Sequence, residues 1–176
     1  MYNKYTGIIL KKHPFGEADE LLTVYTREAG KLRCKAVSVR KPSSKMAGHV
    51  QSLNEIEFEL AGRGMLPVLI SVRSRAVNNY LRVNLRKFAY ALVGIETLYR
   101  LTADREANER AYDGLSQFLR ELGESLDEHQ IVRKFQLSLL SLFGFAFPGG
   151  SEDELDRFIE EILERQIKSV KFLESL

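Results

Sequence analysis

The stretch that decides the fold of the first half is Glu55-Ile56-Glu57-Phe58-Glu59-Leu60, in which acidic and apolar side chains alternate strictly. A second stretch, Lys31-Leu32-Arg33-Cys34-Lys35-Ala36, alternates between long cations and small or apolar side chains. Alternation with a period of two predicts β-strands with one buried and one solvated face. Three further strand-like runs occupy residues 5–10, 21–26 and 68–72. Five short strands of this kind predict a small barrel or sandwich rather than a parallel sheet.

The second half predicts helices, because its apolar residues recur at spacings of three and four. These residues form four stripes, which begin at Leu81, Tyr112, Ile131 and Leu155. Ser125 with Glu128, and Ser151 with Glu154, fit the capping-box pattern of a helix start. Strands followed by helices predict an α+β chain, either as one fold or as two domains.

The charge changes sign along the chain. The whole sequence of 176 residues has 26 Lys and Arg against 24 Asp and Glu. Residues 1–80 hold 13 basic and 7 acidic residues, a net +6, whereas residues 81–176 hold 13 and 17, a net −4. We therefore predict a basic, DNA-binding domain at 1–79 and an acidic, all-helical domain at 80–176, because a polyanion binds where positive charge collects.

Several classes of protein are disfavoured by the same sequence. The hydrophobic content of 44% and the charged content of 28% are typical of globular domains. No apolar run is long enough to span a membrane, and the start of the chain has no signal-peptide core. No P-loop, GxGxxG, GxSxG or HExxH motif is present, so we predict no catalytic residue, no cofactor and no enzyme activity. We expect a cytoplasmic, nucleoid-associated protein without a membrane partner.

The strongest functional signal is the segment between Glu28 and Glu55, which contains no acidic residue. It carries the six cations that we predict to bind DNA phosphates: Lys31, Arg33, Lys35, Arg40, Lys41 and Lys45. The first three occupy every second position of a strand, about 7 Å apart on one face. The last three lie in a loop with serine hydroxyls. Such a surface predicts salt-dependent binding to the phosphate backbone. The alternative is a solvated basic edge that prevents strand-to-strand aggregation.

A five-stranded barrel with a basic face is typical of an OB-fold that binds single strands. Binding of this kind also uses aromatic platforms for the bases. The aromatic residues available for stacking in this half are Tyr2, Tyr5, Phe15 and Tyr25. Most of them are expected to lie in the core or at its rim.

Ordered motifs along nearly the whole chain resemble the RecO family of bacterial recombination mediators and DNA-repair proteins. In the first half these motifs are residues 6–11, 16–26, 30–32, 39–42, 47–49, 58–60 and 66–69. In the second half they are Arg133-Lys134-Phe135-Gln136-Leu137, residues 142–145 with Pro148, and residues 167–173. The resemblance implies an N-terminal OB-fold and a C-terminal helical domain, in agreement with the pattern of strands and helices.

The resemblance also implies an activity. Members of the family bind single-stranded and double-stranded DNA, anneal complementary strands without ATP, and help RecR to load RecA onto DNA covered by single-stranded-DNA-binding protein (SSB). The alternative for this chain is a protein-interaction adaptor of the same machinery with little DNA affinity of its own.

RecO relatives bind the acidic C-terminal tail of SSB, which ends in Phe, through their helical domain, so the resemblance implies a site for this tail in the helical half. We predict that Arg133 and Lys134 bind its carboxylates beside Phe135. The alternative is that both cations are solvated, or that Arg133 pairs with an acid on a neighbouring helix.

Two departures from the family pattern bear on these expectations. Many relatives carry two CxxC pairs that hold zinc before the last helix, whereas residues 144–150 here run directly into it. A single cysteine, Cys34, cannot supply such a site, so we predict a shortened form without metal. In addition, Val37-Ser38 stands where the family tends to have Lys-Gly.

Overall fold

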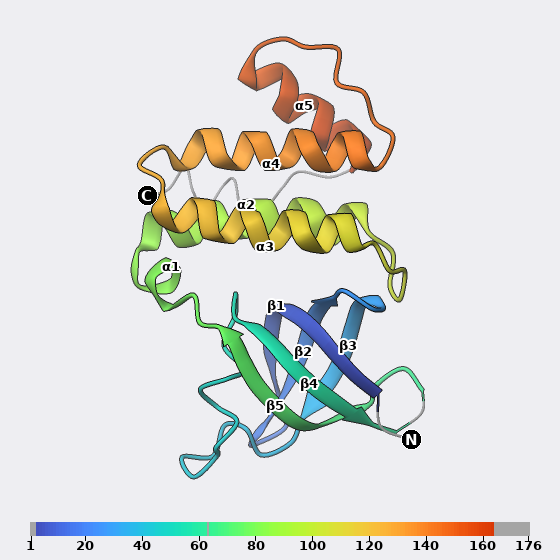
Figure 1. Cartoon of the computed structure of the whole chain (residues 1–176), viewed down its shortest axis with the longest axis vertical. Coiled ribbons are helices and arrows are strands. Elements are labelled where there is room, and N and C mark those ends of the chain that lie inside the picture. The colour runs from blue at the N-terminus through green and yellow to red at the C-terminus, as the bar shows by residue number, and fades with distance from the viewer. Residues whose placement is uncertain (1–2, 63, 164–176) are drawn as a thin grey trace. The chain divides into compact units, whose positions relative to one another are not determined.

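The computed structural model describes residues 3–62 and 64–163. Its first unit is a closed five-stranded barrel in the order β1-β2-β3-β5-β4 (Figure 1). The strands are β1 (Asn3–Phe15), β2 (Asp19–Thr26), β3 (Gly30–Ala36), β4 (Glu55–Ala61) and β5 (Val68–Ala76). β3 and β5 pair in parallel, and the other neighbours pair antiparallel. The predicted α+β class, with an OB-type barrel followed by helices, is confirmed.

The barrel interior is filled by the apolar half of each alternating strand. On β4, Ile56, Phe58 and Leu60 are buried, while the glutamates between them are only partly covered. On β3, Leu32 and Cys34 enter the same core. Burial raises the pKa of the Cys34 thiol to about 12, because the thiolate would lose its hydration there. Cys34 therefore acts as a small apolar core residue.

The segment between β3 and β4 consists of consecutive turns that are tied to the barrel. Val39 and Val50 join the barrel core, and Leu53 is also fully buried. The buried amide of Asn78 donates to the Leu53 carbonyl at 2.7 Å. The loop is therefore anchored at both ends, although the sequence carries no period that would predict it.

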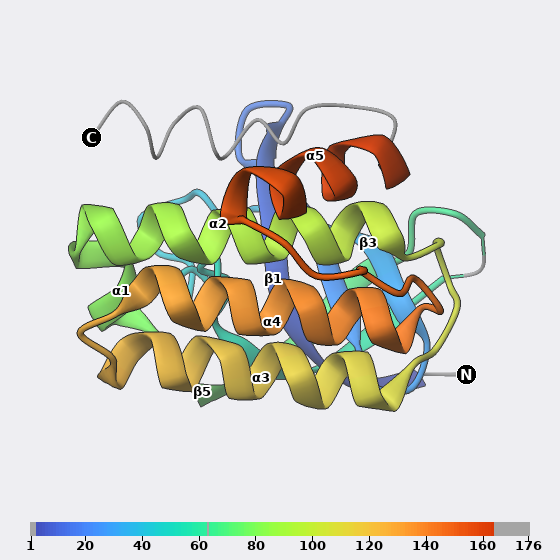
Figure 2. The ribbon, with the colours of Figure 1, turned by 90° about the horizontal axis from the view of Figure 1, so that it is seen from above.

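The second unit is built from helices. They are α1 (Asn79–Val83), α2 (Leu85–Leu101), α3 (Glu109–Glu124), α4 (Glu128–Leu142) and α5 (Glu152–Ile162). α2, α3 and α4 run side by side (Figure 2), with Phe118 of α3 stacked on Phe135 of α4 at 4.4 Å between ring centroids. α5 packs Leu155 and Ile159 against Leu140 of α4. Among the described residues, no helix has the length and hydropathy needed to cross a membrane.

The two predicted capping boxes have different outcomes. The box at Ser151 and Glu154 is present, with both reciprocal hydrogen bonds, and begins α5 as predicted. The box at Ser125 and Glu128 is wrong, because Asp127 caps α4 and accepts from the Gln130 amide at 3.1 Å. Ser125 instead accepts from the Asp127 amide and closes the preceding turn. The motifs at residues 167–173 lie outside the described residues.

The chain does not divide into its two units at a single point. The barrel unit comprises Met1–Asn79 and Ala103–Tyr112, and the helical unit comprises Tyr80–Thr102 and Asp113–Leu176. Residues 103–112, which we call the linker, follow α2, belong to the barrel unit and end in the first turn of α3. The predicted domain boundary near residue 79 stays a prediction, and the linker adds a second segment to the barrel unit.

Candidate nucleic-acid interface

The three cations of β3 lie on one face of the strand, and each of them forms an ion pair with a carboxylate. Lys31 is only 5% exposed, and its Nζ lies 3.4 Å from Oδ1 of Asp104. Arg33 is half exposed, and its Nη2 lies 3.6 Å from Oδ2 of the same carboxylate. Burial lowers the pKa of Lys31, and Asp104 opposes this shift. Lys31 and Arg33 therefore present less free positive charge than their sequence predicts.

Asp104 reaches β3 because the linker is fixed along the strand. The Arg105 amide donates to the Lys31 carbonyl at 2.9 Å, and Asp104 forms a parallel bridge with Lys31. Gly30 adopts a φ of 64°, and a Cβ there would collide with the backbone of Glu106. Only glycine permits this close approach.

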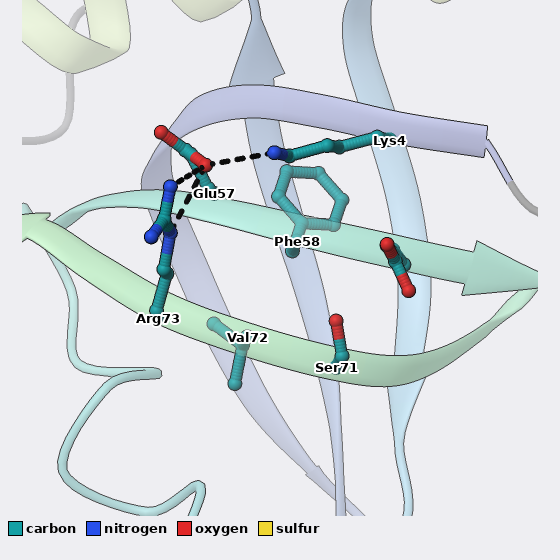
Figure 3. A pocket seen from close by; sticks show the side chains of 7 residues that line it. Lys4, Glu57, Phe58, Ser71, Val72 and Arg73 are labelled. Carbon is teal, nitrogen blue, oxygen red and sulfur yellow. Dashed lines mark hydrogen bonds and ion pairs between the residues drawn. The ribbon is translucent and has the colours of Figure 1, made fainter.

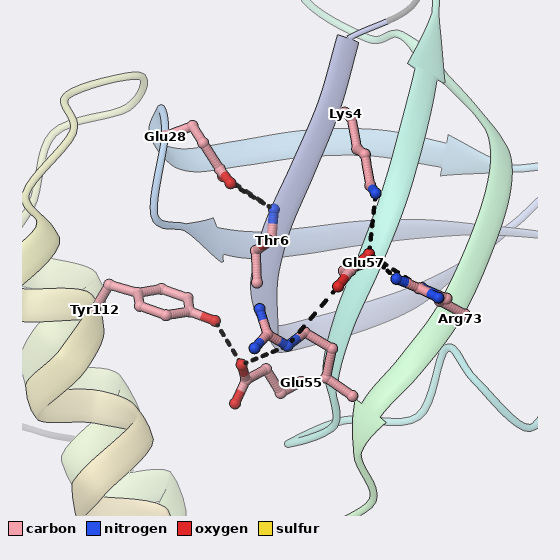
Figure 4. A network of polar contacts seen from close by, with 8 residues as sticks. Lys4, Thr6, Glu28, Glu55, Glu57, Arg73 and Tyr112 are labelled. Atoms are coloured by element: carbon pink, nitrogen blue, oxygen red, sulfur yellow. Dashed lines mark hydrogen bonds and ion pairs between the residues drawn. The ribbon is translucent and has the colours of Figure 1, made fainter.

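The far end of the linker is held by Tyr112. Its hydroxyl donates to Oε1 of Glu55 at 2.9 Å (Figure 4), and the guanidinium of Arg27 lies 4.9 Å from its ring centroid. Burial, reinforced by the charge of Glu55, raises the pKa of Tyr112. The sequence places Tyr112 in a helical stripe and offers no signal for this contact, because its partner lies on β4.

Lys35 lies towards the opposite end of β3. Its Nζ pairs with Oδ2 of Asp19 at 2.8 Å and lies 5.1 Å from the ring centroid of Phe15. The hydrogen bond from Lys35 and the one from the Ser38 amide hold the pKa of Asp19 below its ordinary value. Phe15 is 44% exposed, so this end of the strand offers a cation beside an open aromatic face.

The basic loop that follows is fixed to the turn between β1 and β2. The Arg40 amide donates to the Ala18 carbonyl at 2.9 Å, and its guanidinium donates to the Glu17 carbonyl at 3.3 Å. The Ser38 amide donates to Asp19 at 2.7 Å. These contacts bring together Phe15, Lys35, Arg40 and Lys41, which we call the basic patch. Lys45 is also exposed and follows in the same loop.

Arg40 and Lys41 expose their charges on an anchored backbone. No ion pair to a carboxylate is recorded for either side chain in the described part of the chain, although Lys41 acts through space on Asp19. Of the six predicted phosphate-binding cations, Arg40, Lys41 and Lys45 thus remain exposed, Lys31 is buried, and Arg33 and Lys35 are paired. Of the four aromatic residues, Tyr25 is fully buried and Tyr2 lies outside the described residues.

A second polar face covers β1, β4 and β5. Glu57 accepts from Arg73 at 2.6 Å and pairs with Lys4 at 3.2 Å (Figures 3 and 4). Hydrogen bonds from these cations hold the pKa of Glu57 below its ordinary value. Lys4 and Arg73 are largely exposed, whereas the Glu57 side chain is 16% exposed. Glu57 is thus covered by cations rather than freely solvated.

The three residues predicted to bind the SSB tail do not form one site. Arg133 holds both oxygens of Asp156 on α5, with Nη2 at 2.7 Å from Oδ2. Lys134 pairs instead with Glu121 on α3 at 3.1 Å. Phe135 is buried in the stack on Phe118.

Lys134 nevertheless borders a groove of about 120 Å³ between α3 and α4. Its apolar lining includes Phe118, Ile131 and Phe135, and Glu121 and Lys134 form its polar rim. We call this the α3–α4 groove. In residues 3–62 and 64–163, no group of three or more His, Cys, Asp or Glu side chains is placed to hold a metal ion.

Comparison with known proteins identifies the family. The model described as "Recombination protein O N terminal" matches residues 1–76, and "Recombination protein O C terminal" matches residues 82–149. The DNA repair protein RecO of Moorella thermoacetica is 32% identical over 140 residues, which are 80% of this chain and 52% of the relative. That of Pelotomaculum thermopropionicum is 31% identical over 142 residues, 81% of this chain and 55% of the relative.

A more distant match is the DNA repair protein RecO of Listeria monocytogenes, 27% identical over 143 residues, 80% of this chain and 55% of the relative. The chain thus spans about half the length of the curated relatives it matches. The two matched models are the N-terminal and C-terminal parts of a single family and together cover most of the sequence. The chain therefore belongs to the RecO family.

Proposed function

We propose that this chain acts in DNA repair and homologous recombination by binding single-stranded DNA, and also double-stranded DNA, through the basic patch and Lys45. The observation that carries the proposal is the exposure of Arg40 and Lys41 on a loop that three backbone and side-chain hydrogen bonds hold to the barrel. Fixed cations engage phosphates with little further loss of conformational freedom.

Phe15 supports a preference for single strands. An aromatic face beside a cationic track allows an unpaired base to stack while its phosphate is neutralised. Phe15 is open to solvent and adjoins Lys35, as this mode requires. Family membership supports the further steps: annealing of complementary strands without ATP, and cooperation with RecR in loading RecA onto SSB-covered strands.

The proposal predicts a specific salt dependence. Each phosphate neutralised on a single strand contributes about −0.7 to the slope of log affinity against log salt. Replacing Arg40 and Lys41 together with Ala should weaken binding to all sequences about equally and make the slope shallower by about 1.4. Fluorescence anisotropy with a labelled single strand at several salt concentrations measures both quantities.

A matched control removes two exposed cations from the helical unit. The Arg120→Ala and Arg157→Ala double variant has the same net charge as the basic-patch variant. It should bind almost like the wild type. Equal losses of affinity in the two double variants would show a general charge effect and refute a local site.

Annealing rates of SSB-coated strands, with and without the chain, test the proposed role in recombination.

We further propose that the helical unit binds the acidic SSB tail in the α3–α4 groove. The stacked rings of Phe118 and Phe135 provide an apolar floor, and Lys134 is a largely exposed cation at its rim. A terminal Phe fits the floor, and a carboxylate fits the cation. Arg133 forms hydrogen bonds with Asp156 and does not line this groove, so Lys134 is the predicted cation that is placed to bind the carboxylate of the tail.

A further inference from the structure

A second concave site lies at one end of the barrel. It is a pocket of about 250 Å³ whose lining includes Asn3, Tyr5, Leu32, Leu60, Pro67 and Arg105. Leu32 and Leu60 are almost fully buried and form an apolar floor. The ring of Tyr5 forms part of the wall, and it is fixed by packing on Phe58 at 5.6 Å between centroids. The mouth of a barrel is a frequent place for ligand sites.

Two glycines line this pocket. Gly62 and Gly64 belong to the loop between β4 and β5 and adopt φ values of 100° and 116°. No heavy atom lies within 4 Å of the position a Cβ would take on Gly64. Met65, which follows Gly64 in the same loop, is 89% exposed.

Arg105 is held over the pocket in an unfavourable backbone conformation. Its φ of 62° lies in the left-handed region, which Gly or Asn adopts more readily. The amide of Arg105 is fixed by the Lys31 carbonyl, and Nη2 donates to the Gly64 carbonyl at 2.6 Å. An arginine held in this strained conformation points to a role for its side chain.

The lining defines the chemistry of the ligand. A flat ring can lie against Tyr5 and the leucine floor, while Arg105 donates hydrogen bonds and the Asn3 amide both donates and accepts. A nucleobase has this combination of apolar faces and polar edges. In a duplex its faces are covered by stacking and its pairing edge is engaged, so only an unpaired base can enter.

We propose that the mouth of the barrel binds one unpaired nucleobase of single-stranded DNA, with Tyr5 as the stacking platform and Arg105 as the donor to its edge. The proposal rests on the proposed function, because it assumes that the strand is held on the barrel. It assigns a site for the base, whereas the basic patch binds the backbone.

The first test uses two probes of equal length, an oligodeoxythymidine and the same backbone without bases. The measured quantity is the affinity for oligodeoxythymidine divided by the affinity for the abasic strand. Because both probes have the same phosphates, this ratio reports the contribution of the bases. Tyr5→Leu should lower this ratio at least fivefold, as loss of stacking on one base predicts. Tyr5→Phe keeps the ring and should retain the wild-type ratio.

The second test uses Arg105→Asn, which relieves the unfavourable φ. We expect an unchanged or higher unfolding temperature together with a lower affinity ratio. Separately, a Met65→Trp reporter, the only tryptophan of its chain, should be quenched by oligodeoxythymidine and not by the abasic strand.

The outcomes separate the two proposals. If the wild type binds neither probe, the proposed function fails, and the base site fails with it. If it binds both probes equally, or if Tyr5→Leu and Arg105→Asn leave the ratio unchanged, only the base site is refuted. Quenching of the reporter by an apolar peptide, but not by oligodeoxythymidine, would assign the pocket to a protein partner instead.

Discussion

Asp104 is the residue that most changes the interpretation of the basic strand. Its two oxygens contact Lys31 and Arg33, the first two of the three cations predicted along β3. A carboxylate that pairs with both cations competes directly with a DNA phosphate. The sequence could not reveal this contact, because more than 70 positions separate Asp104 from Lys31 and no local period joins them.

Removing this carboxylate charge should strengthen DNA binding. Asp104→Asn removes the carboxylate charge that Arg33 and Lys31 contact, so we expect tighter binding to single strands and a salt slope steeper by about 0.7 for each cation that then engages a phosphate. Anisotropy titrations at several salt concentrations measure this change. Asp153→Asn, which alters an exposed acid on α5, is the matched control for net charge. Identical affinity and slope in the wild type and Asp104→Asn would contradict the competition.

Arg133 shows what residue-level reasoning can predict on a helix. Successive residues on an α-helix point about 100° apart, so helix geometry directs the side chains of Arg133 and Lys134 to different neighbouring elements. The structure gives them Asp156 on α5 and Glu121 on α3. The partner of each cation depends on tertiary packing, which the sequence alone does not specify.

At the scale of elements, periodicity predicted the strands and helices whose two faces differ strongly. β3 and β4 alternate along their whole length, and both are present with the expected residues inside. The capping box at Ser151 located the start of α5 correctly. The turns between β3 and β4, and residues 103–108 of the linker, follow no period, because their conformations depend on contacts with distant strands.

The close packing of α2 against α4, and against the rings of Phe118 and Phe135, depends on Gly94. A Cβ at this position would lie 2.5 Å from Cε1 of Phe118 and 3.1 Å from Cδ1 of Phe135. Both rings are buried and stacked, so they have little room to move. The helices therefore approach closely because one residue has no side chain.

We predict that Gly94→Ala destabilises the protein, although alanine favours a helix by about 1 kcal/mol. Overpacking in a well-filled core costs about 1–3 kcal/mol, which exceeds that gain when the neighbours cannot shift. Denaturant unfolding measures the free energy. Gly114→Ala, on α3, is the matched control, because its Cβ would lie 3.7 Å from the nearest Phe135 atom, an ordinary contact. Greater stability of Gly94→Ala than of the wild type would show that the rings can move.

At the scale of the whole molecule, the order of strands and helices was enough to predict the fold class. The residues that make up each unit were not predictable in the same way, because the linker joins the barrel unit after two intervening helices, α1 and α2. This arrangement supplies Asp104, Arg105 and Tyr112 to the barrel unit. Asp104 contacts the basic strand β3, and Arg105 lines the pocket at the end of the barrel. None of the three residues belongs to the basic segment between Glu28 and Glu55, which first indicated DNA binding.

The division of charge between the halves of the sequence predicts that DNA binding and peptide binding can be separated by mutation. Lys134→Ala should weaken binding of a labelled acidic peptide ending in Phe about tenfold, as loss of a charge-assisted hydrogen bond predicts. The fold should be retained, because the exposed pair with Glu121 contributes at most about 1 kcal/mol. The Arg40→Ala and Lys41→Ala double variant should show the reverse pattern, with normal peptide binding and weak DNA binding.

The same experiment decides between the mediator and the adaptor. A mediator requires both activities in the wild type, and each variant should then reduce the annealing of SSB-coated strands. Lys134→Ala should leave annealing of naked strands unchanged, because the α3–α4 groove contacts only the peptide in this proposal. A wild-type chain that binds the peptide but no DNA, even at low salt where phosphate contacts are strongest, would establish the adaptor. Peptide binding that Lys134→Ala leaves intact would place the partner site elsewhere than the α3–α4 groove.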